Sequence, residues 1–63
     1  MDGTERINVK RGALVRVVQK QDQQSERTTE GIVKDILTNS PNHPRGIKVR
    51  LESGIIGRVK EVL

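Results

Sequence analysis

The sequence of 63 residues contains no cysteine and no phenylalanine, tyrosine or tryptophan, and it has one histidine. Without cysteine the chain can form neither a disulfide nor a thiolate metal site. One histidine leaves too few ligands for a structural zinc site. No stretch approaches the roughly 20 apolar residues of a membrane-spanning helix, and the amino terminus lacks the apolar run of a signal peptide. We therefore expect a cytoplasmic protein with no metal, no cofactor and no membrane partner.

Patterns typical of catalysis are also missing. The serines Ser25, Ser40 and Ser53 fall in expected loops or turns, and none has an obvious base within its motif. The eight acidic residues are scattered without the spacing of metal ligands. The six glycines are dispersed and form no phosphate-binding loop. The sequence thus predicts a protein that is not an enzyme.

What the chain does have is aliphatic side chains and positive charge. Isoleucine, valine and leucine supply 18 residues, and 14 of these are β-branched, which favours strands over helices. A chain of this length buries only about 60% of its unfolded surface, so we expect one small domain. The formal net charge of +4 is consistent with a polyanionic partner.

Residues 13–20 form the first expected strand. Apolar and charged residues alternate along it, and Val15 and Val17 lie on the face that we assign to the core. The next eight residues, 21–28, contain no apolar side chain and predict a solvated loop.

Residues 29–38 form the second expected strand, whose alternation is interrupted. The polar pair Lys34-Asp35 separates two aliphatic pairs. A β-bulge at this point would turn both Val33 and Ile36 inward and bend the strand. A short helix is the alternative, which the glycine at position 31 and the β-branched residues disfavour.

Residues 43–60 predict a β-hairpin, which begins in a loop stiffened by two prolines. Aliphatic and basic residues alternate from Ile47 to Leu51, and Gly54 ends a three-residue turn at the position that needs positive φ. Folding the chain about Ser53 puts aliphatic residues on the inner face and basic residues on the outer face. The expected cross-strand pairs are Leu51–Ile55, Val49–Gly57 and Ile47–Val59 inside, and Arg50–Ile56 and Lys48–Arg58 outside.

Four to five short strands around an aliphatic core favour an all-β fold. At this size a small, partly open barrel is expected, because closure removes exposed strand edges. We assign residues 11–63 to this single domain. Residues 1–10 precede it as either a flexible segment or an edge strand led by Ile7 and Val9.

Several short motifs occur together along the chain. They are Gly12-Ala13-Leu14-Val15, Lys20-Gln21-Asp22-Gln23, and the stretches 29–38, 43–51 and 54–59. This combination resembles the YwbE-like family, a group of small, uncharacterised proteins of bacteria and archaea. The resemblance implies a compact SH3-like β domain and no established activity.

A shorter pattern resembles another class of domain. Gly31-Ile32-Val33, followed by Ile36 and a later Val49, is similar to the KOW type of SH3-like domain. Domains of that type occur in ribosomal proteins and transcription elongation factors. The likeness implies RNA or ribosome binding only by analogy of fold.

The candidate site consists of the basic residues of the hairpin and of the loop before it. They are Lys48, Arg50, Arg58 and Lys60 on the outer face, with Arg45 and His43 in the loop. Like charges opposite one another in a sheet are mildly destabilising, which suggests a surface that meets negative charge; a merely solvated face is the alternative. Because the chain has no aromatic ring on which bases would stack, we expect contact to the phosphates of structured RNA or the ribosome.

Two further alternatives follow from the sequence. The ring of His43 would bind a phosphate, or it would accept or donate a hydrogen bond within its own proline-rich loop. The protein as a whole would be a protein-interaction module, in which a strand edge or the loop 21–28 meets an acidic partner.

Overall fold

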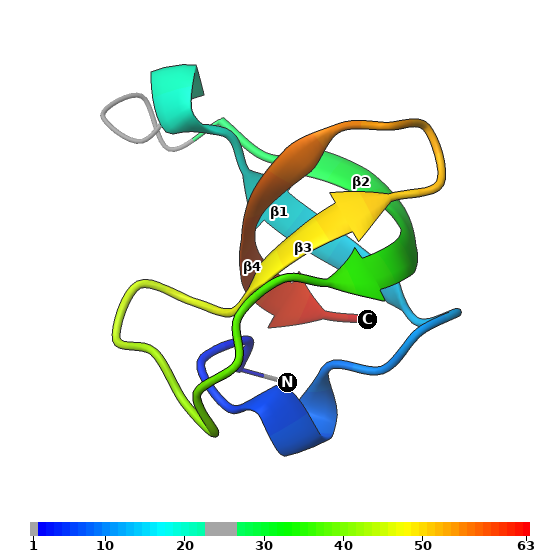
Figure 1. Cartoon of the computed structure of the whole chain (residues 1–63). Coiled ribbons are helices and arrows are strands. Elements are labelled where there is room, and N and C mark those ends of the chain that lie inside the picture. The colour runs from blue at the N-terminus through cyan, green and yellow to red at the C-terminus, as the bar shows by residue number, and fades with distance from the viewer. Residues whose placement is uncertain (1, 23–26) are drawn as a thin grey trace.

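A computed structural model describes residues 2–22 and 27–63 as a small β-barrel (Figure 1). The strands are β1 (Leu14–Val18), β2 (Thr29–Ile36), β3 (Lys48–Leu51) and β4 (Ile56–Val62), and two short 3-10 turns are η1 (Arg6–Asn8) and η2 (Lys20–Asp22). Each strand pairs antiparallel with the next, and β4 pairs with β1. The predicted small, all-β, SH3-like barrel is confirmed. The pairing of β1 with β4 closes the ring that the sequence leaves partly open.

The core is made of aliphatic side chains that alternate along the strands. In β1, Val15 and Val17 are fully buried, while Leu14 is 39% exposed. This confirms that Val15 and Val17 form the inner face of the strand. The hairpin strands contribute in the same way, because successive side chains of a strand point to opposite faces. Among the described residues, the core consists of the buried aliphatic residues Val9, Val15, Val17, Val33, Ile47, Val49, Leu51 and Val59.

Two β-bulges bend the strands of the ring. Val33 and Asp35 face the adjacent residues Leu51 and Arg50 of β3, so Lys34 is the extra residue of β2. This confirms the bulge predicted from the broken alternation. A second register shift occurs between β1 and β4, where Lys60 is the extra residue of β4. Bulges increase local twist and bend a strand, which helps four short strands to close. Both extra residues are exposed lysines.

The hairpin of β3 and β4 has the predicted register. Val49 lies opposite Gly57, and the outer pairs Lys48–Arg58 and Arg50–Ile56 form as expected. Gly54 adopts a φ of +94° and donates its N–H to the carbonyl of Leu51 at 2.9 Å. A residue with a Cβ is disfavoured in that region, so the glycine is required by the turn.

The N-terminal segment, residues 2–10, lies along the loop that precedes β3. Gly3 accepts a hydrogen bond from the N–H of Ile47 at 2.8 Å, and Thr4 accepts one from the N–H of His43 at 2.9 Å. Its described residues form η1 and isolated bridges rather than a continuous strand. Val9 is buried in the core, whereas Ile7 is 76% exposed. The segment therefore covers one end of the barrel.

The loop expected over residues 21–28 is described only in part. Residues 23–26 lie outside the described residues, and η2 occupies Lys20–Asp22. Across residues 2–22 and 27–63, no helix has the length and apolar character needed to span a membrane.

Candidate nucleic-acid interface

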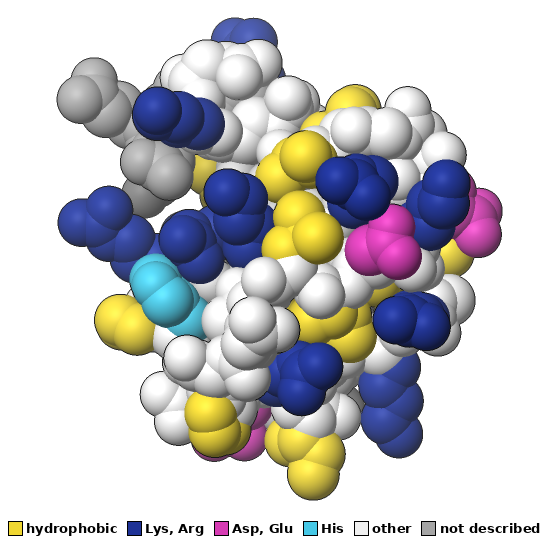
Figure 2. Space-filling model, viewed as in Figure 1, with side chains coloured by type: hydrophobic (Ala, Val, Ile, Leu, Met, Phe, Trp, Pro, Cys, Tyr) yellow, Lys and Arg dark blue, Asp and Glu magenta, His cyan; other side chains and the backbone are white. Residues whose placement is uncertain are grey.

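One group of Lys and Arg side chains lies apart from the acidic side chains, while other basic side chains lie elsewhere on the surface (Figure 2). Figure 2 shows Lys and Arg side chains gathered at the left of the view, on the side where the loop before β3 lies in Figure 1. The acidic side chains visible in this view lie apart from them. The hydrogen bonds and ion pairs of the described residues show how this separation arises.

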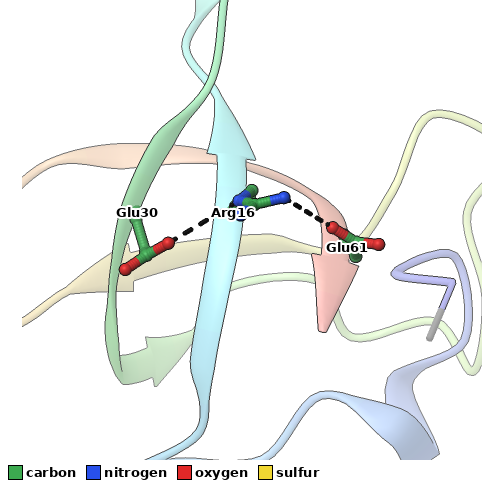
Figure 3. Close-up of polar contacts among 3 residues, drawn as sticks. All are labelled: Arg16, Glu30 and Glu61. Carbon is green, nitrogen blue, oxygen red and sulfur yellow. Dashed lines mark hydrogen bonds and ion pairs between the residues drawn. The ribbon is translucent and has the colours of Figure 1, made fainter. Parts of the chain in front are cut away.

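Arg16 of β1 is neutralised by acids on both neighbouring strands (Figure 3). Its Nε lies 3.6 Å from Oε1 of Glu30 on β2, and its Nη1 donates to Oε1 of Glu61 on β4 at 3.0 Å. All three side chains are about half exposed. Exposed ion pairs stabilise a fold by only about 0–1 kcal/mol, so the main consequence is electrostatic: Arg16 is paired, and the cluster keeps a net negative charge.

Arg50 of β3 is engaged in the same manner. Its Nη1 donates to Oδ2 of Asp35 on β2 at 3.2 Å, because the bulge at Lys34 brings Asp35 opposite Arg50. On the other side of Arg50 lies Ile56, which is 40% exposed. Arg50 shares the outer face predicted for it, but its charge is paired.

The remaining basic residues of the hairpin lie together. Lys48 and Arg58 are cross-strand partners, and Lys60 follows on β4. The Nη1 of Arg58 donates to the carbonyl of Gly46 at 3.1 Å, which places its guanidinium beside the peptide that joins Gly46 to Ile47. We call Arg45, Lys48, Arg58 and Lys60 the basic surface. Among the residues that the structure describes, none of these four has an ion-pair partner.

A groove runs along this surface. Arg45, Arg58 and Lys60 line it together with Asp2 and Thr4 of the N-terminal segment, and it has a volume of about 650 Å³. We call this hollow the basic groove. Three cations and one carboxylate line its walls, so the net charge of the lining is positive.

The floor of the basic groove depends on Gly46. This residue has a φ of +103°, and a Cβ at the position would collide with the carbonyl of Val59 on β4. Only glycine therefore lets the loop approach β4 closely enough for the carbonyl of Gly46 to receive Arg58.

His43 does not line the basic groove. Its Nδ1 accepts a hydrogen bond from the backbone N–H of Arg45 at 3.1 Å, and its own carbonyl accepts one from the N–H of Gly46 at 3.0 Å. The ring thus shapes the loop that carries Arg45, as in the structural alternative given above.

The sequence does not indicate that the N-terminal segment contributes to this site. Asp2 lines the basic groove, and its Oδ1 accepts a hydrogen bond from the N–H of Thr4 at 2.9 Å. An Asp two residues before the residue whose N–H donates to it is a short-range signal of this geometry. The long-range contact of the segment with the loop before β3 has no such signal.

Two other observations bear on alternative sites. Within residues 2–21 and 27–63, no three His, Cys, Asp or Glu side chains gather in a way that would hold a metal ion. A second hollow of about 740 Å³ is lined by Glu5, Arg6, Ile7, Lys10, Ile36, Asn39, Pro41 and Asn42.

These features define a small SH3-like barrel with a basic surface at one side. The chain belongs to the family described as "Uncharacterized conserved protein (DUF2196)", whose model matches residues 2–62. It is 51% identical to "Uncharacterized protein YwbE" of Bacillus subtilis (strain 168) over 63 residues, which cover all of this chain and 97% of that relative. The resemblance to the YwbE-like family is thereby confirmed. No solved structure matches the chain.

Proposed function

We propose that this protein is a non-enzymatic, cytoplasmic binding module that contacts structured RNA, free or within the ribosome, through the basic surface. The observation that supports this proposal is the sorting of charge. Glu30, Glu61 and Asp35 pair with Arg16 and Arg50, so these three acids do not neutralise the four cations of the basic surface.

The kind of nucleic acid follows from the side chains that are present. Arginine and lysine bind phosphates regardless of base sequence, and the chain has no aromatic ring for stacking unpaired bases. Double-stranded RNA is recognised largely through its shape and its phosphates. A compact barrel with four unpaired cations on one side therefore suits the backbone of folded RNA.

The proposal predicts a measurable dependence of affinity on salt. Each neutralised phosphate adds roughly 0.7–0.9 to the slope of log affinity against log salt concentration. Four contacts give a slope of about −3, which is steep enough to measure by fluorescence anisotropy with a labelled RNA hairpin.

Two charge-matched double variants test which surface is used. Lys48→Glu with Lys60→Glu reverses two cations of the basic surface, whereas Lys10→Glu with Lys34→Glu reverses two exposed lysines elsewhere. Each pair lowers the formal net charge from +4 to zero. We expect the first pair to weaken binding at least about 10-fold more than the second, since each reversed contact also adds repulsion. Equal losses, or no detectable binding of the unaltered protein at low salt, would overturn the proposal.

The same experiment separates RNA from an acidic protein partner. Each of the four strands is paired on both sides in the closed ring, so the protein-interaction alternative rests on the loop 21–28, whose residues 23–26 lie outside the described residues. Binding of a protein that persists at high salt and is lost on replacement of that loop would favour this alternative.

A further inference from the structure

We propose that the basic groove is a subsite for one phosphodiester group of the bound RNA. This inference rests on the proposed function and narrows it to a position and a chemical group. The groove has a volume of about 650 Å³, which lies within the usual range for sites that take small ligands. That space holds a phosphate with its flanking sugar and not a length of helix.

Arg58 is the fixed member of the subsite. It is half-buried, and its Nη1 is already held by the carbonyl of Gly46 at 3.1 Å. A guanidinium has five N–H donors in a planar fork, so the others remain for an anion. A donor that is ordered before binding loses less entropy when the ligand arrives. Arg58 thus supplies the directed contact.

Arg45 and Lys60 reach the same groove from different parts of the chain. Arg45 belongs to the loop whose turn is held by His43, and its side chain is exposed. Lys60 is the extra residue of the bulge in β4. Lys60 follows Arg58 by two residues, so the alternation of the strand places both on the outer face, and both line the groove.

Asp2 limits the charge that the groove accepts. Its carboxylate lines the same hollow as the three cations, so a second phosphate on that wall would be repelled. Replacement of Asp2 by asparagine keeps an oxygen that can accept from the N–H of Thr4 and removes only the charge.

The two bulge lysines provide a matched pair of variants. Lys60 lines the groove and Lys34 does not, yet both are exposed, both are extra residues of a bulge, and both lose one charge on replacement by glutamine. The probes are inorganic phosphate, followed by amide NMR shifts, and a labelled RNA hairpin, followed by anisotropy.

We expect Lys60→Gln to weaken RNA binding about five-fold and to reduce the salt slope by roughly one, while Lys34→Gln changes affinity by less than two-fold. Inorganic phosphate should shift the amides of residues 45–46 and 58–60, and Asp2→Asn should strengthen its binding at least two-fold. Thermal unfolding of each variant shows whether it retains the fold.

The outcomes separate this inference from the function on which it rests. Failure of the unaltered protein to bind the RNA hairpin overturns the proposed function. Normal RNA binding with equal effects of Lys60→Gln and Lys34→Gln overturns the subsite alone. Phosphate shifts that are spread over the surface, and that Asp2→Asn leaves unchanged, also contradict the subsite.

Discussion

The replacement Gly46→Ala tests how closely the loop must approach β4. Gly46 combines a φ of +103° with a backbone atom in the way of any Cβ, the carbonyl oxygen of Val59. Gly54 offers a control at the tip of the hairpin. It has a similar φ of +94°, but a Cβ built there meets no atom within 4 Å. The two positions thus share the conformational cost and differ in the collision.

The magnitudes follow from these two terms. Placing alanine in the left-handed region costs about 1–2 kcal/mol, and the stiffer unfolded chain offsets about 0.4–1 kcal/mol of that cost. Gly54→Ala should therefore destabilise by about 1 kcal/mol. At Gly46 the collision with backbone adds about 1–3 kcal/mol, as overpacking does in a core. The total of about 2–4 kcal/mol approaches the whole stability of a domain this small, which is roughly 3–5 kcal/mol.

Urea unfolding and thermal unfolding, both followed by far-UV circular dichroism, measure the free energy of unfolding and the Tm of both variants. In a domain of this size 1 kcal/mol corresponds to about 4–8 °C in Tm, so Gly54→Ala should melt several degrees lower and Gly46→Ala far lower or be largely unfolded at 25 °C. Equal destabilisation of the two variants would refute the argument, because the collision at Val59 would then carry no cost.

The remaining predictions concern the core and the pairing of Arg50. Leu51→Ala removes a fully buried side chain of β3 and should cost about 2–5 kcal/mol in urea unfolding, whereas a loss below 1 kcal/mol would contradict the placement of Leu51 in the core. Asp35→Asn breaks an ion pair whose side chains are 43% and 36% exposed, so stability should fall by less than about 1 kcal/mol. The freed Arg50 should strengthen RNA binding and steepen the salt slope, and unchanged RNA affinity would show that this end of the hairpin lies outside the interface.

The register of the β3–β4 hairpin and the bulge of β2 can be predicted from local sequence patterns, because both depend on residues close together in the chain. Alternation from Ile47 to Leu51, with Gly54 at the turn, determines the register of β3 and β4, since a shift by one residue would bring basic side chains into the core. The bulge of β2 can likewise be predicted from the alternation of apolar and polar residues. Lys34-Asp35 interrupts a pattern that must still bury Val33.

The parts that depend on distant segments do not follow from local patterns. The contact of Gly3 with Ile47 joins residues more than forty positions apart, and nothing in the composition of the N-terminal segment indicates it. Arg50 pairs with Asp35 because of the register between β2 and β3. A long loop connects these two strands, so no short turn fixes that register in the sequence. For this reason the sequence identifies the cations of the candidate site but not which of them are paired, nor the contribution of Asp2 to the groove.

Closure of the barrel and assembly of the basic groove depend on the same irregularity. Four short strands need extra bending to form a ring, and the bulge in β4 supplies part of it by adding Lys60 between the partners of Arg16 and Val17. On one side of that bulge Glu61 is held by Arg16; on the other side Val59 is buried, and Arg58 is held by the carbonyl of Gly46. Lys60, the extra residue of this bulge, therefore lies between the paired Glu61 and the cation Arg58, which has no ion-pair partner among the described residues. Its side chain lines the basic groove and does not enter the core.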